Sequence, residues 1–139
     1  MRTIAMFSAA ALICVAAPAS AAQGLQPGEW QFTQTLTSPM LPGPQTMTSK
    51  HCVKPEEGKD PGKVMAEQDR KSDCKLTKSK LAGSRYDWEM ACGNGMHGKG
   101  VMHLGNGTMD SEIHMTGSVA GQKLDMLTKM KGKRLGPCK

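Results

Sequence analysis

The sequence contains few of the residues that normally build a protein core. Aromatic residues occupy only 4% of its 139 positions. After residue 22, Leu, Ile, Val and Phe number 15 among 117 residues, about 13%, whereas folded globular domains usually exceed about 20%. Glycine and proline are frequent, with 16 and 8 residues in the chain, and both disfavour helix interiors. A helix bundle, a parallel α/β enzyme and a multidomain protein are therefore poor descriptions of this chain.

Catalytic motifs are also absent from the sequence. It has no Gly-x-Ser-x-Gly, no His-Glu-x-x-His, no phosphate loop and no dinucleotide fingerprint. The glycine-rich stretch Gly93-Asn94-Gly95 falls between two predicted hairpins and is interpreted as a turn. Because no nucleophile, base and orienting residue can be named together, we expect no enzymatic activity, no catalytic residue and no cofactor.

One long apolar run exists, and it lies at the N-terminus. Residues 4–15 are uncharged and apolar, and an Ala-x-Ala site follows at residues 19–21. This order predicts a cleaved signal peptide over residues 1–22, with Cys14 in the discarded part, and a single periplasmic or secreted domain over residues 23–139. A membrane-spanning helix is disfavoured, since it needs about 20 apolar residues and a proline ends this run early.

Four cysteines follow the predicted leader. An even count in an exported chain predicts two disulfides. Three pairings are open, but a hairpin centred on Gly83 favours Cys74 with Cys92, which leaves Cys52 for Cys138. A zinc site is disfavoured because the sequence has no Cys-x-x-Cys pair.

Alternation of apolar and polar residues predicts an antiparallel β-protein. The pattern is cleanest at Tyr86, Trp88 and Met90, which alternate with mostly charged residues. Leu76 and Leu81 have opposite parity, which predicts a bulge between them. The seven predicted strands, four of them in two hairpins, fall within residues 28–37, 45–53, 74–92, 97–117 and 122–131.

The second hairpin also predicts its own register. Asn106-Gly107 favours a two-residue type I′ turn. Such a turn places Leu104 opposite Met109 and His103 opposite Asp110. This register sorts apolar residues to one face and charged residues to the other, and a slip of one residue would mix them.

The predicted fold is all-β. Seven antiparallel strands in sequence order describe a meander, which would curl into a barrel or a half-barrel to manage its edges; a two-layer sandwich is the alternative. Residues 55–72 interrupt the strands as a short helix or a loop insertion. Asp60-Pro61 predicts the start of a helix that runs to about Arg70.

The apolar face is rich in methionine, with Met90, Met102, Met109, Met115, Met126 and Met130 predicted to point toward it. The simplest interpretation is core packing, because methionine fills irregular gaps. Thioethers also suit Cu(I), and a methionine-lined concavity adapts to small apolar ligands. The predicted ligand-facing residues are Trp30, Trp88, Met90, Met102, Met126 and Met130.

The polar face carries histidines and lysines. His97 and His114 are diagonal neighbours, within reach of a shared ion, but an open strand face lacks the outer groups that orient metal ligands, so we expect no metal there. A basic strip near the C-terminus would attract an anionic membrane surface or protect a sheet edge, and we expect no nucleic-acid partner. The strip consists of Lys123, Lys129, Lys131, Lys133, Arg134 and Lys139.

Four segments together suggest a known family. They are Gly28-Glu29-Trp30, Cys52-Val53-Lys54-Pro55-Glu56, the hairpin from Cys74 to Cys92 with Gly83, Trp88 and Met90, and residues 132–138. In combination they resemble the bacterial exported family called domain of unknown function 3617. The resemblance covers essentially the whole chain after the leader, and it implies an exported β-rich protein with no catalytic residue to transfer. Gly28-x-Trp30 also looks like the lipocalin signature, with Arg134 placed to cover Trp30; this is a fold-level analogy.

These observations predict a monomeric, non-enzymatic exported domain that binds a small apolar or amphipathic ligand in the concave face of its sheet. Two alternatives remain. One is an envelope structural or stress protein that contacts anionic surfaces through the basic strip. The other is a copper-binding module that uses methionine and histidine side chains.

Overall fold

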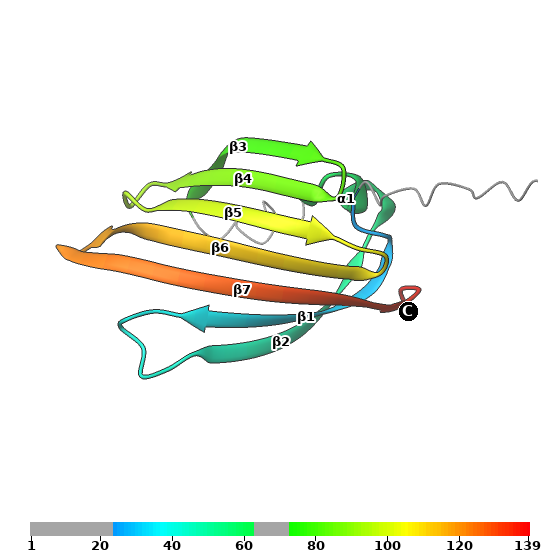
Figure 1. Ribbon diagram of the computed structural model, residues 1–139, viewed down its shortest axis with the longest axis horizontal. Helices are drawn as coiled ribbons and strands as arrows, with labels where there is room; N and C mark the ends of the chain where they lie inside the picture. The colour runs from blue at the N-terminus through cyan, green and yellow to red at the C-terminus, as the bar shows by residue number, and fades with distance from the viewer. Residues whose placement is uncertain (1–23, 63–72) are drawn as a thin grey trace, which may run out of the picture.

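The computed structural model describes residues 24–62 and 73–139, and it confirms the all-β class (Figure 1). The seven strands are β1 (Gly28–Thr37), β2 (Gln45–Val53), β3 (Cys74–Ala82), β4 (Arg85–Cys92), β5 (His97–Leu104), β6 (Thr108–Val119) and β7 (Gln122–Gly136). A short helix, α1 (Pro55–Lys59), follows β2. Within the described ranges, no helix combines the length and apolar character needed to cross a membrane.

The predicted elements and the observed ones differ at two places. The predicted signal peptide lies outside the described residues, as does most of the predicted helix to Arg70, of which only Pro61 and Gly62 are described and helical. The short helix expected within residues 55–72 is present as α1, but it begins at Pro55, before the predicted start at Asp60-Pro61. Pro55 occupies its first turn, and Glu57 accepts a hydrogen bond from the Lys54 backbone N–H at 2.9 Å. This carboxylate closes a capping box in which lysine replaces the usual serine or threonine.

The strands form one antiparallel sheet in the order β2-β1-β7-β6-β5-β4-β3. Strands β3 to β7 follow each other as a meander, but β1 pairs with β7 and β2 lies outside β1. The structure thus departs from a meander in sequence order between β2 and β3, which do not pair in the described part of the chain.

The sheet is open, with β2 and β3 as its edges. Neighbouring strands alternate in direction, so with seven strands the two edge strands run the same way. A parallel pair needs a long crossover connection, and residues 54–73 connect β2 to β3, but these two strands do not pair in the described part of the chain. The sheet is an open, curled half-barrel, not a closed barrel.

The predicted registers are confirmed. In the β5–β6 pair, Leu104 lies opposite Met109 and His103 lies opposite Asp110. The β3–β4 register shifts between Leu76 and Lys78, which is the predicted bulge, and it returns both leucines of β3 to the same face as the apolar residues of β4.

The sheet has an apolar inner face and a charged outer face. Side chains of residues directly opposite each other share a face, and the registers place the tryptophans and methionines of neighbouring strands together. The buried core consists of Leu25, Trp30, Phe32, Val53, Tyr86, Trp88, Met90, Met102, Leu104 and Met109.

Inner-face glycines explain how so few aliphatic residues suffice. The indole ring of Trp88 on β4 lies over Gly100, its direct neighbour on β5. On β7, the ring of Phe32 covers Gly132, where a Cβ atom would stand 3.0 Å from Phe32 Cε1. Large side chains that lie flat over glycines fill the interior in place of interdigitating Val, Ile and Leu.

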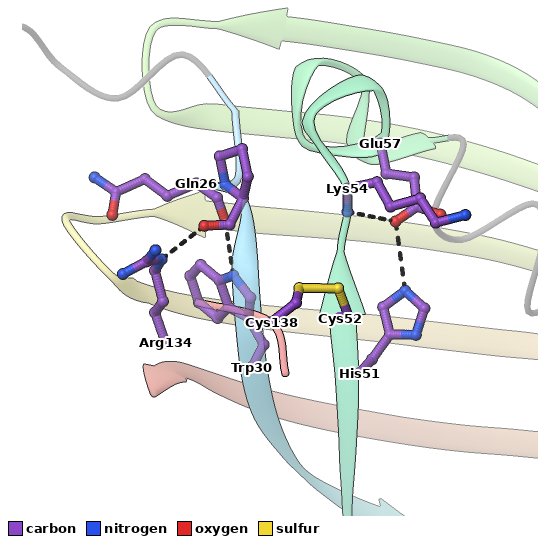
Figure 2. The surroundings of a disulfide bond; sticks show 9 residues. Gln26, Trp30, His51, Cys52, Lys54, Glu57, Arg134 and Cys138 are labelled. Atoms are coloured by element: carbon purple, nitrogen blue, oxygen red, sulfur yellow. Dashed lines mark hydrogen bonds and ion pairs between the residues drawn. A yellow bond between two sulfur atoms is a disulfide. The ribbon is translucent and has the colours of Figure 1, made fainter. Parts of the chain in front are cut away.

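The end of the sheet near α1 is tied together by three contacts of the N- and C-terminal segments (Figure 2). Cys52 at the end of β2 is disulfide-bonded to Cys138. Trp30 Nε1 donates to the Gln26 carbonyl and Arg134 Nε donates to the Pro27 carbonyl, both at 2.8 Å. Arg134 lies directly opposite Trp30 in the β1–β7 pair, so the juxtaposition expected from the Gly-x-Trp motif is present.

Gly28 is required at this junction. Its φ of +143° lies in the region that favours glycine, and a Cβ atom would stand 2.7 Å from Arg134 Nε. Glycine therefore lets the guanidinium approach the backbone and reach the Pro27 carbonyl.

Candidate functional site

The inner face divides into a packed half and a half-buried half. Near α1, the side chains of Trp30, Tyr86 and Met109 are almost fully buried. On β1, β6 and β7, in the same cross-strand rows as the buried side chains of β4, an apolar surface keeps partial exposure. We call this surface the methionine patch; its members are Leu36, Ile113, Met115, Leu124, Met126 and Met130. Because these residues come from β1, β6 and β7, three adjacent strands, the patch is one surface on the sheet.

The six predicted ligand-facing residues all lie on the inner face, but not in one environment. Trp30, Trp88, Met90 and Met102 are core residues, with exposed fractions from 0% to 8%. Met126 and Met130 lie in the methionine patch and are half-buried. A ligand on the folded protein would therefore first contact the last two residues.

Two hydrogen-bond donors in the core have no partner among the described residues: Tyr86 Oη and Trp88 Nε1. The two rings stack with centroids 5.5 Å apart and an interplanar angle of 24°. A buried donor without a partner costs about 1–3 kcal/mol, so such groups are uncommon and call for an explanation.

The surroundings of the Tyr86 hydroxyl are crowded and weakly polar. A Cβ atom on Gly62 would collide with this hydroxyl, which places the hydroxyl against the connection after α1. Burial raises the pKa of Tyr86, and the charge of Asp60 raises it further. The Ser79 hydroxyl opposes this effect and lowers that pKa, but it is not positioned to form a hydrogen bond with the phenol.

The outer face neutralises much of its own charge. Glu89 Oε2 lies 3.1 Å from Lys78 Nζ, and its other oxygen lies 3.8 Å from Lys99 Nζ. These groups line an open depression of about 690 Å³ over β3, β4 and β5. The hydrogen bond from Lys78 is the main reason that the pKa of Glu89 is lowered. Since the depression is lined by ion pairs that already satisfy each other, it is a poor candidate site.

Some histidines and lysines of the outer face already form ion pairs. His114 Nε2 lies 2.7 Å from Asp125 Oδ1. Among the described residues, no group of three or more His, Cys, Asp or Glu side chains is placed to hold a metal ion. Lys129 Nζ lies 3.7 Å from Glu112 on β6, and Lys131 lies opposite Asp110. Arg134 does not belong to the strip, because it lies on the inner side, opposite Trp30.

Two disulfides cross-link the sheet. Cys74 and Cys92 face each other in the β3–β4 pair, and Cys52 is bonded to Cys138. This is the pairing that the predicted hairpin favours, and it indicates an oxidising environment. No sequence pattern pointed to the two unpartnered donors, since their environment depends on tertiary packing, such as the approach of Gly62 to the Tyr86 hydroxyl.

Comparison with known proteins gives one match. The family described as "Protein of unknown function (DUF3617)" matches residues 25–138. No curated protein matches the chain, and no solved structure matches it.

Proposed function

The chain belongs to the DUF3617 family of proteins of unknown function, and from the geometry of its inner face we propose that it is an exported, non-enzymatic and monomeric domain that binds a small amphipathic molecule on the methionine patch. The observation that carries this proposal is the half-buried state of apolar side chains gathered on one face of β1, β6 and β7. Apolar side chains that stay partly accessible on a folded protein are available to an apolar ligand.

The composition of the patch favours a ligand of variable shape. Met115, Met126 and Met130 have flexible, polarizable side chains that adapt to different partners. Leu36 and Ile113 add more rigid contacts on either side. An alkyl chain or a similar apolar group would be accommodated by rotamer changes, without movement of the backbone.

The unpartnered donors favour a ligand that also carries a hydrogen-bond acceptor. Trp88 lies in the same cross-strand row as Gly100 and Ile113, so its indole lies beside the patch. The negative charge of Asp60 acts on the neighbouring Tyr86 hydroxyl, which disfavours an anionic head group there. A neutral acceptor, such as an ester or a ketone, that inserts beside the indole would give Trp88 Nε1 a partner.

The compartment in this proposal follows from the cross-links and the N-terminus. The two disulfides need an oxidising environment. The apolar run and the Ala-x-Ala site of residues 1–22 support export.

The test measures binding of a monoacylglycerol, which has an alkyl chain and a neutral ester, by native mass spectrometry and by displacement of a polarity-sensitive apolar dye. The decisive variants are Met126→Gln and Leu127→Gln. These residues are adjacent on β7, and both are half-buried, but they lie on opposite faces of the sheet.

The proposal expects at least a tenfold loss of binding in Met126→Gln and none in Leu127→Gln. Equal loss in both variants, or no uptake by the unmodified protein, would refute it. Binding that requires anionic vesicles and disappears at high salt would instead favour the basic strip on β7.

A further inference from the structure

Two methionine sulfur atoms approach a single point on the inner face. Met90 on β4 and Met115 on β6 both lie directly opposite Gly98 on β5. A Cβ atom on Gly98 would stand 2.5 Å from Met115 Sδ and 3.2 Å from Met90 Sδ. Because glycine has no side chain there, thioethers from the strands on either side share the space above it.

Further methionines surround this point. Met126 on β7 lies directly opposite Met115. The buried Met96 packs against Gly117, where its Cγ would stand 3.0 Å from a Cβ atom. The cross-strand row through Gly98 contains only Leu76, Met90, Met115 and Met126, so it has no charged side chain.

The chemistry of this arrangement is selective. Thioethers are neutral, soft and polarizable ligands, which suit Cu(I) and are poor ligands for hard divalent ions. A monovalent ion also loses less hydration free energy than a divalent ion when neutral ligands replace its water. Met115 and Met126 are half-buried, so an ion at this point would have an entry path from solvent.

We propose that Met90 and Met115, with Met126 as the third ligand, bind one soft monovalent metal ion, Cu(I) or Ag(I). The site goes beyond the proposed amphiphile binding and does not depend on it. An alkyl chain needs only an apolar surface, which leucine would also provide, whereas the metal site needs sulfur.

The experiment titrates the protein with Ag(I), which avoids redox chemistry, and with Cu(I) under anaerobic conditions against a chromophoric competitor. Free thiols are alkylated first, because a free thiol would bind these ions itself. The test variants are Met90→Leu and Met115→Leu. The controls are Met109→Leu, buried at the other end of the inner face, and Met47→Leu, which is 58% exposed on β2.

One ion should bind per chain, with at least a tenfold loss of affinity in both test variants and no change in the controls. The methyl resonances of Met90, Met115 and Met126 should shift on Ag(I) addition, while that of Met109 should not. Should Met90→Leu disturb folding, the half-buried Met115 still decides the question. Absence of binding at micromolar ion, or the same affinity in all four variants, overturns the site and leaves these methionines as core packing.

Discussion

Inner-face glycines on β5 should differ sharply in their tolerance of alanine. At Gly100, a Cβ atom would collide with the rigid indole of Trp88. Overpacking of this kind costs about 1–3 kcal/mol, while removal of a glycine from a strand gains about 0.5–1 kcal/mol. The net loss in Gly100→Ala is therefore centred on about 1 kcal/mol and is about 2.5 kcal/mol at most, which lowers Tm by roughly 4–10 °C for a domain of this size.

Gly98 provides the matched comparison. It lies two residues away on the same strand and face, but the atoms that a Cβ would meet belong to the flexible side chains of Met90 and Met115. These side chains have three rotatable bonds and can move aside, so Gly98→Ala should change stability by less than about 0.5 kcal/mol. Gly43 lies in a loop with no atom within 4 Å of a Cβ position, and Gly43→Ala should gain about 0.4–1 kcal/mol.

Thermal and urea unfolding of the three variants, followed by far-UV circular dichroism, measure these differences. The expected order of stability is Gly43→Ala, then Gly98→Ala, then Gly100→Ala. If Gly100→Ala is as stable as Gly98→Ala, the interior does not depend on rings packed over glycines. That packing would then not explain how the protein folds with so few aliphatic residues.

Three further predictions concern single groups. Reduction of the disulfides should lower the free energy of unfolding by about 4.5 kcal/mol for Cys52–Cys138, which spans 86 residues, and by about 3 kcal/mol for Cys74–Cys92, which spans 18; melting with and without reductant tests this, and an unchanged Tm after complete thiol labelling would contradict it. Tyr86→Phe should leave the ligand-free protein equally stable or more stable by up to about 1 kcal/mol, because its buried hydroxyl has no partner among the described residues; a clear loss in urea unfolding would show that the hydroxyl is bonded. The Lys54 backbone N–H, and secondarily His51, hold the pKa of Glu57 below its usual value of 4.5, so its stabilising contribution is present above the unfolded-state pKa and is lost as the pH falls through the lowered folded-state pKa; Glu57→Gln should flatten the stability profile below about pH 4.5, and an unaltered acid limb would argue against this role.

Much of the fold follows from local patterns. The bounds of β1 and β2, the register set by Asn106-Gly107 and the bulge after Leu76 were all predictable, because alternation and turn chemistry act over a few residues. The pairing of β1 with β7 was not, since it joins residues about a hundred positions apart and leaves no local signal. A short helix was expected within residues 55–72, but its start at Pro55 was not, because Lys54 is an unusual residue before a helix.

The sequence predicted which face of the sheet carries the candidate site, but not which of its residues are buried. Alternation placed Met90, Met102, Met126 and Met130 on one side of the sheet, as the registers show. Which of them are buried depends on the side chains and the connection that pack over them. Alternation shows only on which face a side chain lies. The convergence of two sulfur atoms above Gly98 likewise depends on side-chain rotamers.

The shared direction of β2 and β3 has a geometric consequence. One additional strand laid between them could run opposite to both, and the count would become even. All eight neighbouring pairs would then be antiparallel, and the edge backbone groups of β2 and β3, which pair with no further strand among the described residues, would find partners. The lysines of β3 at positions 75, 78 and 80 disfavour pairing of this edge with a strand from another chain. The other edge strand, β2, carries a single lysine, at position 50.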